Sequence, residues 1–290
     1  MDIRQLHYFI TVVEEKTVTA AAEKLHMTQP PLTIQLHMLE EELGCKLFRR
    51  DGRNLRLTDA GRHMYKRAVE IAGMCDNAKR EMNEFQSGTL GTLRIGVISS
   101  VRGTVFINWI KKYHEKYKNV KISVFSANTY QLIEKLQNRE IDMAITRTPF
   151  AASGLETEFI KREEICAVGH KSYFSGIENE EITLSELSKL PLIIYRRWQK
   201  VIENAFEGEG LAANICCVND DALMTLHLSI QKLGVGLLHP SAIPEKIPKS
   251  FKVMPLHEKS LSSEIALVCN DKKTLSEPAA LFWKTALDNI

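Results

Sequence analysis

Polar side chains follow the short apolar segments in the C-terminal two thirds of the chain. Three of these segments are followed, in chain order, by Ser99 and Ser100, by Asn128 and Thr129, and by Thr146 and Arg147. Two later positions of the same kind hold Tyr195 with Arg196, and Asn219 with Asp220. Hydroxyl, amide and guanidinium groups hold small anions such as carboxylates through charge-assisted hydrogen bonds. The chemistry they predict is reversible binding of a small, anionic molecule.

Each of these side chains also has an ordinary structural role as an alternative. Ser, Thr and Asn cap helices at strand-to-helix junctions whether or not a ligand binds there. Arg147 and Arg196 would serve equally well in structural salt bridges. The sequence alone leaves both interpretations open.

Catalytic and metal-binding motifs are missing from the sequence. There is no G-x-S-x-G nucleophile motif, no phosphate-binding P-loop and no H-E-x-x-H motif. The nine histidines are dispersed, and none stands three or four residues from another as a metal-binding helix face requires. We therefore expect neither an enzyme nor a metal or other cofactor.

The elements that position the polar residues alternate between strands and helices. Strands are predicted at about 92–98, 120–126 and 141–146, with helices at about 103–117 and 129–138. Further strands are predicted near 159–168, 191–195, 214–218, 235–238, 251–254 and 264–269. This βαβ order predicts an α/β fold with mostly parallel sheets, whose ligands bind beyond the carboxyl ends of the strands.

The first sixty residues predict three short helices. The first has the apolar stripe Leu6, Phe9, Ile10 and Val13, and a second begins near Thr19 with three alanines that allow close helix packing. The third is expected to be N-capped by the Thr28 side chain and to turn four leucines inward, namely Leu32, Leu36, Leu39 and Leu43.

Polar residues on the outward side of the third helix suit contact with DNA bases. Gln pairs with adenine through two hydrogen bonds, and Thr can bond a base edge or touch the thymine methyl group. The candidates on and before this helix are Thr28, Gln29, Pro31, Thr33 and Gln35. A solvated polar face is the alternative.

Basic residues are concentrated just after this helix. Between Gly44 and Arg67 there are eight Lys and Arg residues and two Asp residues, a net charge of +6, whereas the whole chain carries only +2. A turn at Asp51-Gly52 would place Arg49, Arg50 and Arg53 on a wing that contacts phosphates.

The run TAAAEKLHMTQPPLTIQLHMLEEELGCKLFRRDGRNLRLTDAGR, from Thr19 to Arg62, resembles the LysR-type transcriptional regulators. It combines the alanine-rich helix, the T-Q-P-P-L start, the L-F-x-R wing and the L-T-x-A-G exit at the family's spacing. The family usually has Ser-Arg where this chain has Thr33 and Ile34, so a basic contact expected from the recognition helix is absent.

The resemblance implies a sequence-specific DNA-binding transcriptional regulator controlled by a small-molecule effector. It implies a winged helix-turn-helix at 1–58, a linker helix for dimerisation at 59–88 and an effector-binding domain at 89–290. The last would have a two-lobed, Rossmann-like, type 2 periplasmic-binding-protein fold. Lobe I would cover about 91–161 and 266–290, and lobe II about 162–265, with the chain crossing near Lys161 and Ile265.

The linker helix carries a heptad seam of apolar residues. Its members are Met64, Ala68, Ile71, Cys75, Ala78, Met82 and Phe85, and Gly88 and Gly91 follow. The seam predicts a coiled coil, although a helix lying on its own domain would show a similar pattern. A dimer, which could pair into a tetramer, would read an interrupted inverted repeat in double-stranded DNA. RNA polymerase is a further candidate partner.

Composition and the N-terminus set the remaining limits. The 290 residues predict two or three folding units. Asp2 and Glu14 do not fit a secretory signal, and no apolar run reaches the length of a membrane span. We therefore expect a cytoplasmic protein without a membrane partner, which argues against an exported solute-binding protein. Its six cysteines show no C-x-x-C spacing and are interpreted as small apolar residues, with redox activity as the alternative.

Overall fold

The computed structural model describes residues 1–51, 54–86, 91–101 and 105–288. Two compact units divide the chain. One consists of Met1–Thr89 with Gln137–Glu140, and the other of Leu90–Leu136 with Ile141–Ile290. The fold class is α/β, as predicted.

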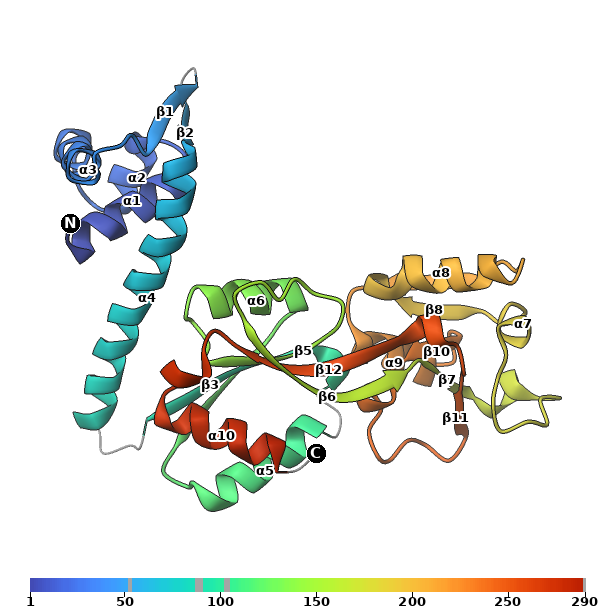
Figure 1. The fold of residues 1–290 in the computed structure, drawn as a ribbon. Helices are drawn as coiled ribbons and strands as arrows, with labels where there is room; N and C mark the ends of the chain where they lie inside the picture. The colour runs from blue at the N-terminus through green and yellow to red at the C-terminus, as the bar shows by residue number, and fades with distance from the viewer. Residues whose placement is uncertain (52–53, 87–90, 102–104, 289–290) are drawn as a thin grey trace. The chain divides into compact units, whose positions relative to one another are not determined.

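The N-terminal unit contains helices and one hairpin (Figure 1). In chain order the elements are α1 (Ile3–Glu15), α2 (Val18–Lys24), α3 (Gln29–Leu43), β1 (Phe48–Asp51), β2 (Asn54–Leu57) and α4 (Asp59–Gln86). Strands β1 and β2 pair antiparallel, with Asp51 opposite Asn54. Gly52, part of the predicted turn, and Arg53, a predicted wing contact, lie outside the described residues.

The core of this unit forms where α1, α2 and α3 meet. Phe9 of α1, Ala21 of α2 and Leu32 of α3 are fully buried in one cluster, so the alanines do allow the close approach that was predicted. The prediction for Leu43 is wrong. It is the last residue of α3, stands outside the cluster that buries the other three leucines, and is exposed.

Helix α3 begins at the predicted residue but without the predicted hydrogen bond. Thr28 has the extended backbone of an N-cap, yet its side chain accepts no hydrogen bond. A capping side chain accepts from the N–H of the second or third helical residue. Here these are Pro30 and Pro31, which have no N–H to donate. The prolines that mark the start of the helix therefore also remove the bond.

Helix α4 is divided in its packing. Ala68 is buried in the core of the N-terminal unit, whereas Ile71 and Met82 are 37% and 60% exposed. Thr58 caps the helix, because its hydroxyl accepts from the N–H of Gly61 at 2.9 Å. The first turns thus lie on their own unit, and later turns leave apolar side chains uncovered.

The C-terminal unit contains two five-stranded sheets. The first sheet has the order β4 (Lys121–Ser126), β3 (Thr92–Val97), β5 (Met143–Arg147), β12 (Ser262–Cys269) and β6 (Glu156–Glu164). The second sheet has the order β11 (Phe251–Pro255), β7 (Cys166–His170), β10 (Val235–Leu238), β8 (Leu192–Tyr195) and β9 (Ile215–Asn219). In each sheet three neighbouring strands are parallel and the other two pairings are antiparallel.

Helices cover both faces of each sheet. For the first sheet, α5 (Val105–Lys116) packs beside α10 (Glu277–Leu287) on one face, and α6 (Thr129–Gln137) lies on the other (Figure 1). For the second, α7 (Leu184–Leu187) and α8 (Gln199–Gly208) bury apolar side chains in one cluster, and α9 (Ala222–Ile230) does so in another. Among the described helices, none combines the length and apolar character that a bilayer span requires.

The chain changes sheets in the middle of one predicted strand. The segment predicted as a single strand at about 159–168 is two strands, β6 in the first sheet and β7 in the second, separated at Ile165. The chain returns through the segment 256–261 into β12, which has a bulge between Ile265 and Ala266. Lys161 and Ile265, where the crossings were predicted, face each other across the β6–β12 pair.

Candidate functional site

Helix α3 presents one exposed face with an isoleucine at its centre. Its buried face consists of Leu32, Leu36, Leu39 and Glu40. Successive helical residues are about 100° apart, so the opposite direction is that of Ile34. We define the outward face of α3 as the exposed residues Pro30, Ile34, His37, Met38 and Glu41. Ile34 lies at its centre and is 58% exposed.

The sequence-predicted DNA contacts divide into two groups on this helix. Thr28, Gln29 and Pro31 are exposed around its N-terminus. Thr33 and Gln35, one residue to either side of Ile34, lie on the flanks and are half-buried. The Thr33 hydroxyl donates to the Gln29 carbonyl at 3.0 Å, and Gln35 accepts from the Gln5 amide of α1 at 3.1 Å.

Sequence reasoning missed the centre of the outward face. It selected polar residue types, whereas the leucine spacing already points away from Ile34 and Met38. The direction opposite the buried leucines was the signal that could have found them.

A buried carboxylate fixes the hairpin to α3. Glu40 Oε1 accepts from the backbone N–H of Leu47 at 2.9 Å and of Phe48 at 3.2 Å, and Oε2 accepts from Lys46 Nζ at 2.7 Å. Burial raises the pKa of Glu40, but the hydrogen bonds from Lys46, Leu47 and Phe48 outweigh it, so the pKa lies below its ordinary value. The charged form of Glu40 therefore holds the start of β1 in place.

The hairpin carries exposed positive charge. Arg49 of β1 pairs with Arg56 of β2 in the strand register, and both side chains are exposed. Such a pair of arginines suits contact with phosphates. Arg50 is part of β1, although its side chain, like Arg53, falls outside what the structure describes.

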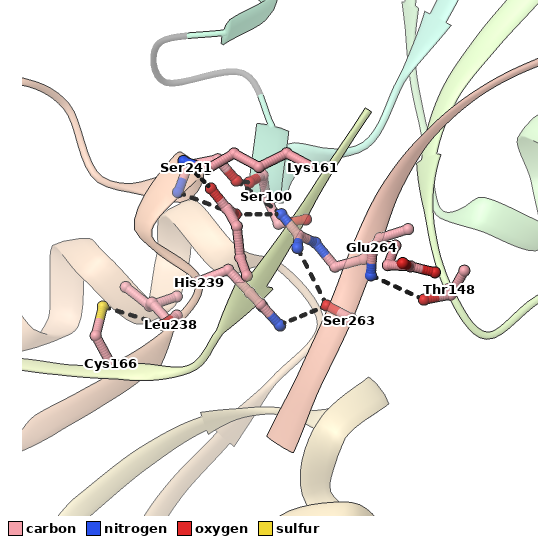
Figure 2. A network of polar contacts seen from close by, with 11 residues as sticks. Ser100, Thr148, Lys161, Cys166, Leu238, His239, Ser241, Ser263 and Glu264 are labelled. Atoms are coloured by element: carbon pink, nitrogen blue, oxygen red, sulfur yellow. Dashed lines mark hydrogen bonds and ion pairs between the residues drawn. The ribbon is translucent and has the colours of Figure 1, made fainter. Parts of the chain in front are cut away.

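A buried polar cluster lies where the two sheets of the C-terminal unit meet. We define the junction cluster as Arg147, Glu163, His239, Ser241 and Ser263, which are all buried. Arg147 donates from Nη2 to Glu163 at 2.9 Å and to Ser241 Oγ at 2.7 Å, and from Nη1 to Ser263 Oγ at 3.1 Å. The bond between His239 Nε2 and Ser263 Oγ, at 2.7 Å, is visible in Figure 2. This cluster ties β5, β6 and β12 to the residues that follow β10.

The first two predicted ligand residues take part in contacts between the sheets. The Ser241 hydroxyl, from the turn after β10, donates to the Ser100 carbonyl at 2.8 Å (Figure 2). Ser99 Oγ accepts from the N–H of Ala222, the first residue of α9, at 3.2 Å. Both serines follow β3 and are buried, so the structure brings them to the junction as predicted from the strand ends.

The two arginines predicted to bind an anion have carboxylate partners within the chain. Arg147 and Glu163 form a buried ion pair, only 1% and 2% exposed at their side chains. Burial raises the pKa of Glu163 and the Arg147 guanidinium lowers it, with a net pKa below its ordinary value. Arg196 is exposed and pairs with Asp220 at 2.7 Å. The salt-bridge alternative therefore describes the observed contacts of both.

Sequence reasoning missed Arg197, which stands next to Arg196. Its Nη2 donates across the junction to the carbonyl oxygens of Arg147 and Pro149, each at 2.8 Å. Its guanidinium lies 5.7 Å from the ring of Tyr130 in α6 and 5.8 Å from that of Trp198. Within the described part of the chain no carboxylate lies at ion-pair distance from it.

Three buried polar atoms at the junction have no hydrogen-bond partner among the described residues. They are Thr146 Oγ1, Arg147 Nε and Arg197 Nε. Most buried polar atoms in proteins are hydrogen-bonded, so these three are candidates for contacts with a bound molecule.

The remaining predicted ligand residues have local roles or lie beside the junction. Asn128 caps α6, since its Oδ1 accepts from the N–H of Gln131 at 3.0 Å. Asn219 bonds Thr225 at 2.9 Å and accepts from the N–H of Asp221 at 3.0 Å. Thr129 is buried at the start of α6, and Tyr195, at the end of β8, is half-buried. Across the described ranges, no group of His, Cys, Asp and Glu residues could hold a metal ion.

Comparison with known proteins identifies both parts of the chain. Residues 3–62 match the model of the bacterial regulatory helix-turn-helix proteins of the lysR family, and residues 86–290 match that of the LysR substrate binding domain. The HTH-type transcriptional regulator BsdA of Bacillus subtilis (strain 168) is 30% identical over 97% of this chain and 99% of its own length. BenM of Acinetobacter baylyi is 27% identical over 82% of this chain and 79% of its own.

Solved structures share the fold over the full length. Full-length CbnR in complex with its target DNA is 22% identical, covers 100% of both chains and has a TM-score of 0.64. Full-length BenM is 24% identical, with 100% of this chain and 96% of that chain covered and a TM-score of 0.58.

The matched regions account for the two units and for the sites described above. The N-terminal match contains α3 and the β1–β2 hairpin, and the C-terminal match contains the junction cluster. The chain is a DNA-binding transcriptional regulator with an effector-binding domain, and its relatives are regulators and not enzymes. It belongs to the LysR family of bacterial helix-turn-helix transcriptional regulators.

Proposed function

We propose that this regulator senses a small anionic effector at the junction of its two C-terminal sheets. The observation that carries the proposal is the set of buried atoms without a hydrogen-bond partner among the described residues, Thr146 Oγ1 and Arg197 Nε above all. A carboxylate accepts from a hydroxyl and a guanidinium at once, so a single carboxylate group could satisfy both. Arg197 keeps its charge available because its hydrogen-bond partners among the described residues are neutral carbonyl oxygens.

Effector binding would act by shifting a population of conformations. The hydrogen bonds from Ser241 to Ser100 and from Arg197 to Arg147 join one sheet to the other. An effector that contacts Arg197 and Thr146 together would favour one arrangement of the sheets over another. Only this difference in affinity between arrangements can change the activity of the protein.

We propose that DNA is contacted by α3 and by the β1–β2 hairpin. The exposed Gln29 at the start of α3 is placed for base contacts, and the exposed Arg49 of the hairpin is placed for phosphate contacts. Phosphate contacts supply affinity that falls with salt, whereas base contacts supply the sequence preference.

We propose that a second copy of the chain covers the exposed side of α4. Ile71, Met74 and Met82 are large apolar residues that remain uncovered on this 28-residue helix. Ile71 and Met82 belong to the heptad seam predicted from the sequence, and Met74 is next to its member Cys75. A dimer would carry two α3 helices and read two half-sites of an inverted repeat, in the bacterial cytoplasm where chromosomal DNA is accessible.

A comparison of two neighbouring arginines tests the effector site. Purified protein is screened by thermal shift against small carboxylates and aromatic acids, and the best compound is tested on two variants. Arg197→Ala should lose the stabilisation, whereas Arg196→Ala, whose side chain is exposed and paired with Asp220, should keep it. Equal stabilisation of both variants would move the effector away from Arg197.

The DNA-binding half is tested separately with a mobility shift. Full-length protein should bind a duplex from the upstream region of its own gene, with an affinity that falls steeply as salt increases. Binding that ignores salt, or that is equal for unrelated duplexes at physiological salt, would contradict the proposal.

A further inference from the structure

The centre of the outward face of α3 is an aliphatic side chain that is more than half exposed among the described residues. Ile34 is 58% exposed, although its neighbours Leu32 and Leu36 are buried. It is not in the cluster that forms the core of the N-terminal unit. Ile34 therefore contributes little to the core of its own unit, and its exposed surface is available for contact with another molecule.

The charges of α3 indicate which part of the helix enters a DNA groove. Glu41 and Glu42 are exposed in its last turn, and the latter pairs with the N-terminal amine. Carboxylates are repelled by phosphates, so the last turn would stay away from the DNA backbone. The first turns contain no acidic residue, and the positive end of the helix dipole lies there. Ile34 is five residues, about 7.5 Å, from the helix start and so belongs to the half that enters.

The chemistry of the major groove restricts what Ile34 can contact. Every base edge there presents hydrogen-bond donors or acceptors, and thymine alone adds an apolar group, its 5-methyl. An isoleucine pressed against donors and acceptors would leave them without partners, which costs free energy. Contact with a methyl group removes apolar surface of both partners from water.

We propose that Ile34 reads the 5-methyl group of one thymine in each half-site and so selects thymine over cytosine there. The inference rests on the assignment of α3 as the DNA-reading helix under the proposed function. The family usually has Ser-Arg where this chain has Thr33 and Ile34. An apolar contact from Ile34 would stand in place of the basic contact from that arginine.

Deoxyuridine provides the test, because it pairs as thymine does but lacks the methyl group. The probe is a duplex selected by the full-length protein from a random-sequence pool. Each thymine in its half-sites is replaced in turn by deoxyuridine, and dissociation constants are measured for wild type, Ile34→Ala and Ile107→Ala. Ile107 is a matched control, since it is 54% exposed but lies in α5 of the other unit.

The expected result is a coupling between one methyl group and one side chain. For wild type and Ile107→Ala, deoxyuridine at one position per half-site should weaken binding about fourfold for each methyl lost. Ile34→Ala should bind the thymine duplex about fourfold to tenfold more weakly and be indifferent to that deoxyuridine. Because Ile34 is exposed, the melting temperature of Ile34→Ala should equal that of the wild type.

Other outcomes separate the inference from the function on which it rests. A methyl effect that persists in Ile34→Ala, or no methyl effect at any position, overturns the assignment of Ile34 while DNA binding remains. If Gln29→Ala and Ile34→Ala both leave the selected sequence unchanged, α3 is not the reading helix and the proposed DNA contact fails as well. Ile34→Ala that loses dimerisation would assign the side chain to a second copy and contradict the inference.

Discussion

Glu40 is a single side chain on which the position of the hairpin depends. It stands among the buried leucines of α3, and its carboxylate receives the N–H groups of Leu47 and Phe48 at the start of the wing. A hydrogen bond to a charged group stabilises a folded protein by about 1.5–3 kcal/mol, and the unpaired donors that remain after its loss carry a further penalty.

Substituting Glu40 should loosen the hairpin in a way that depends on pH. Because the folded pKa of Glu40 is lowered, the charged carboxylate contributes its full stability above the unfolded pKa, ~4.3. That contribution is lost as the pH falls through the lower folded value. At pH 7, Glu40→Gln should speed amide hydrogen exchange at Leu47 and Phe48 about tenfold to a hundredfold.

Exchange rates at Leu47 and Phe48 that are equal in wild type and Glu40→Gln at pH 7 would show that the carboxylate does not hold the hairpin. The two proteins should converge only at acidic pH, where the wild-type carboxyl is itself protonated.

At this scale the sequence predicts which positions matter better than it predicts what they do. Ser100 and Arg147 reach the junction because Ser100 follows β3 and Arg147 ends β5, two neighbouring parallel strands. The choice between Arg196 and Arg197 could not be made, since it depends on the short helical turn Arg196–Trp198 that directs one guanidinium to Asp220 and the other across the junction.

Whole elements follow the local pattern closely, with exceptions that have identifiable causes. The strands predicted at about 92–98, 120–126 and 141–146 are β3, β4 and β5. The segment 159–168 was predicted as one strand, whereas the chain leaves one sheet for the other at Ile165. Local periodicity carries no information about which sheet a strand joins.

The sequence left open whether α4 forms a coiled coil or lies on its own unit, and different parts of the helix fit each alternative. Ala68 serves its own unit, as an amphipathic helix lying on its domain would require. Ile71 and Met82 remain exposed, as a seam awaiting a second helix would require. The heptad pattern spans both parts, so sequence alone could not separate them.

A charge on the exposed part of α4 should therefore disrupt dimerisation. Met82→Glu places a carboxylate on the proposed seam, where a buried unpaired charge is strongly unfavourable. Light scattering at micromolar concentration should give the mass of a monomer for Met82→Glu. Met82→Leu, which keeps an apolar side chain, should keep the dimer mass. An unchanged mass for Met82→Glu would exclude this face of α4 as the interface.

At the scale of the whole effector-binding unit, one hydroxyl joins the two sheets. Ser241 Oγ donates to the Ser100 carbonyl and accepts from Arg147, so it links the second sheet to the first at two points. Neither the fold class nor the strand order predicts this contact, because Ser241 is 94 residues from Arg147 and 141 residues from Ser100 in the sequence.

Removing this hydroxyl should destabilise the C-terminal unit. Ser241→Ala leaves the Arg147 guanidinium and the Ser100 carbonyl with one partner fewer each, a cost of about 1–3 kcal/mol. Calorimetry of the full chain should show the transition of this unit lowered by roughly 3–8 °C. Ser262→Ala, which removes a hydrogen-bond partner of the exposed Arg162, is the control and should leave the transition within about 1 °C. Equal unfolding temperatures for Ser241→Ala and Ser262→Ala would show that the Ser241 hydroxyl does not stabilise the C-terminal unit.

Regulation by an effector requires that binding at the junction of the two C-terminal sheets changes the affinity of the protein for DNA. The direct measurement is the dissociation constant of the full-length protein for its selected duplex, with and without a saturating carboxylate that stabilises it in the thermal-shift screen. We expect a change of about fivefold or more for wild type and Arg196→Ala, and none for Arg197→Ala. A dissociation constant that the bound carboxylate leaves unchanged in wild type would contradict the account.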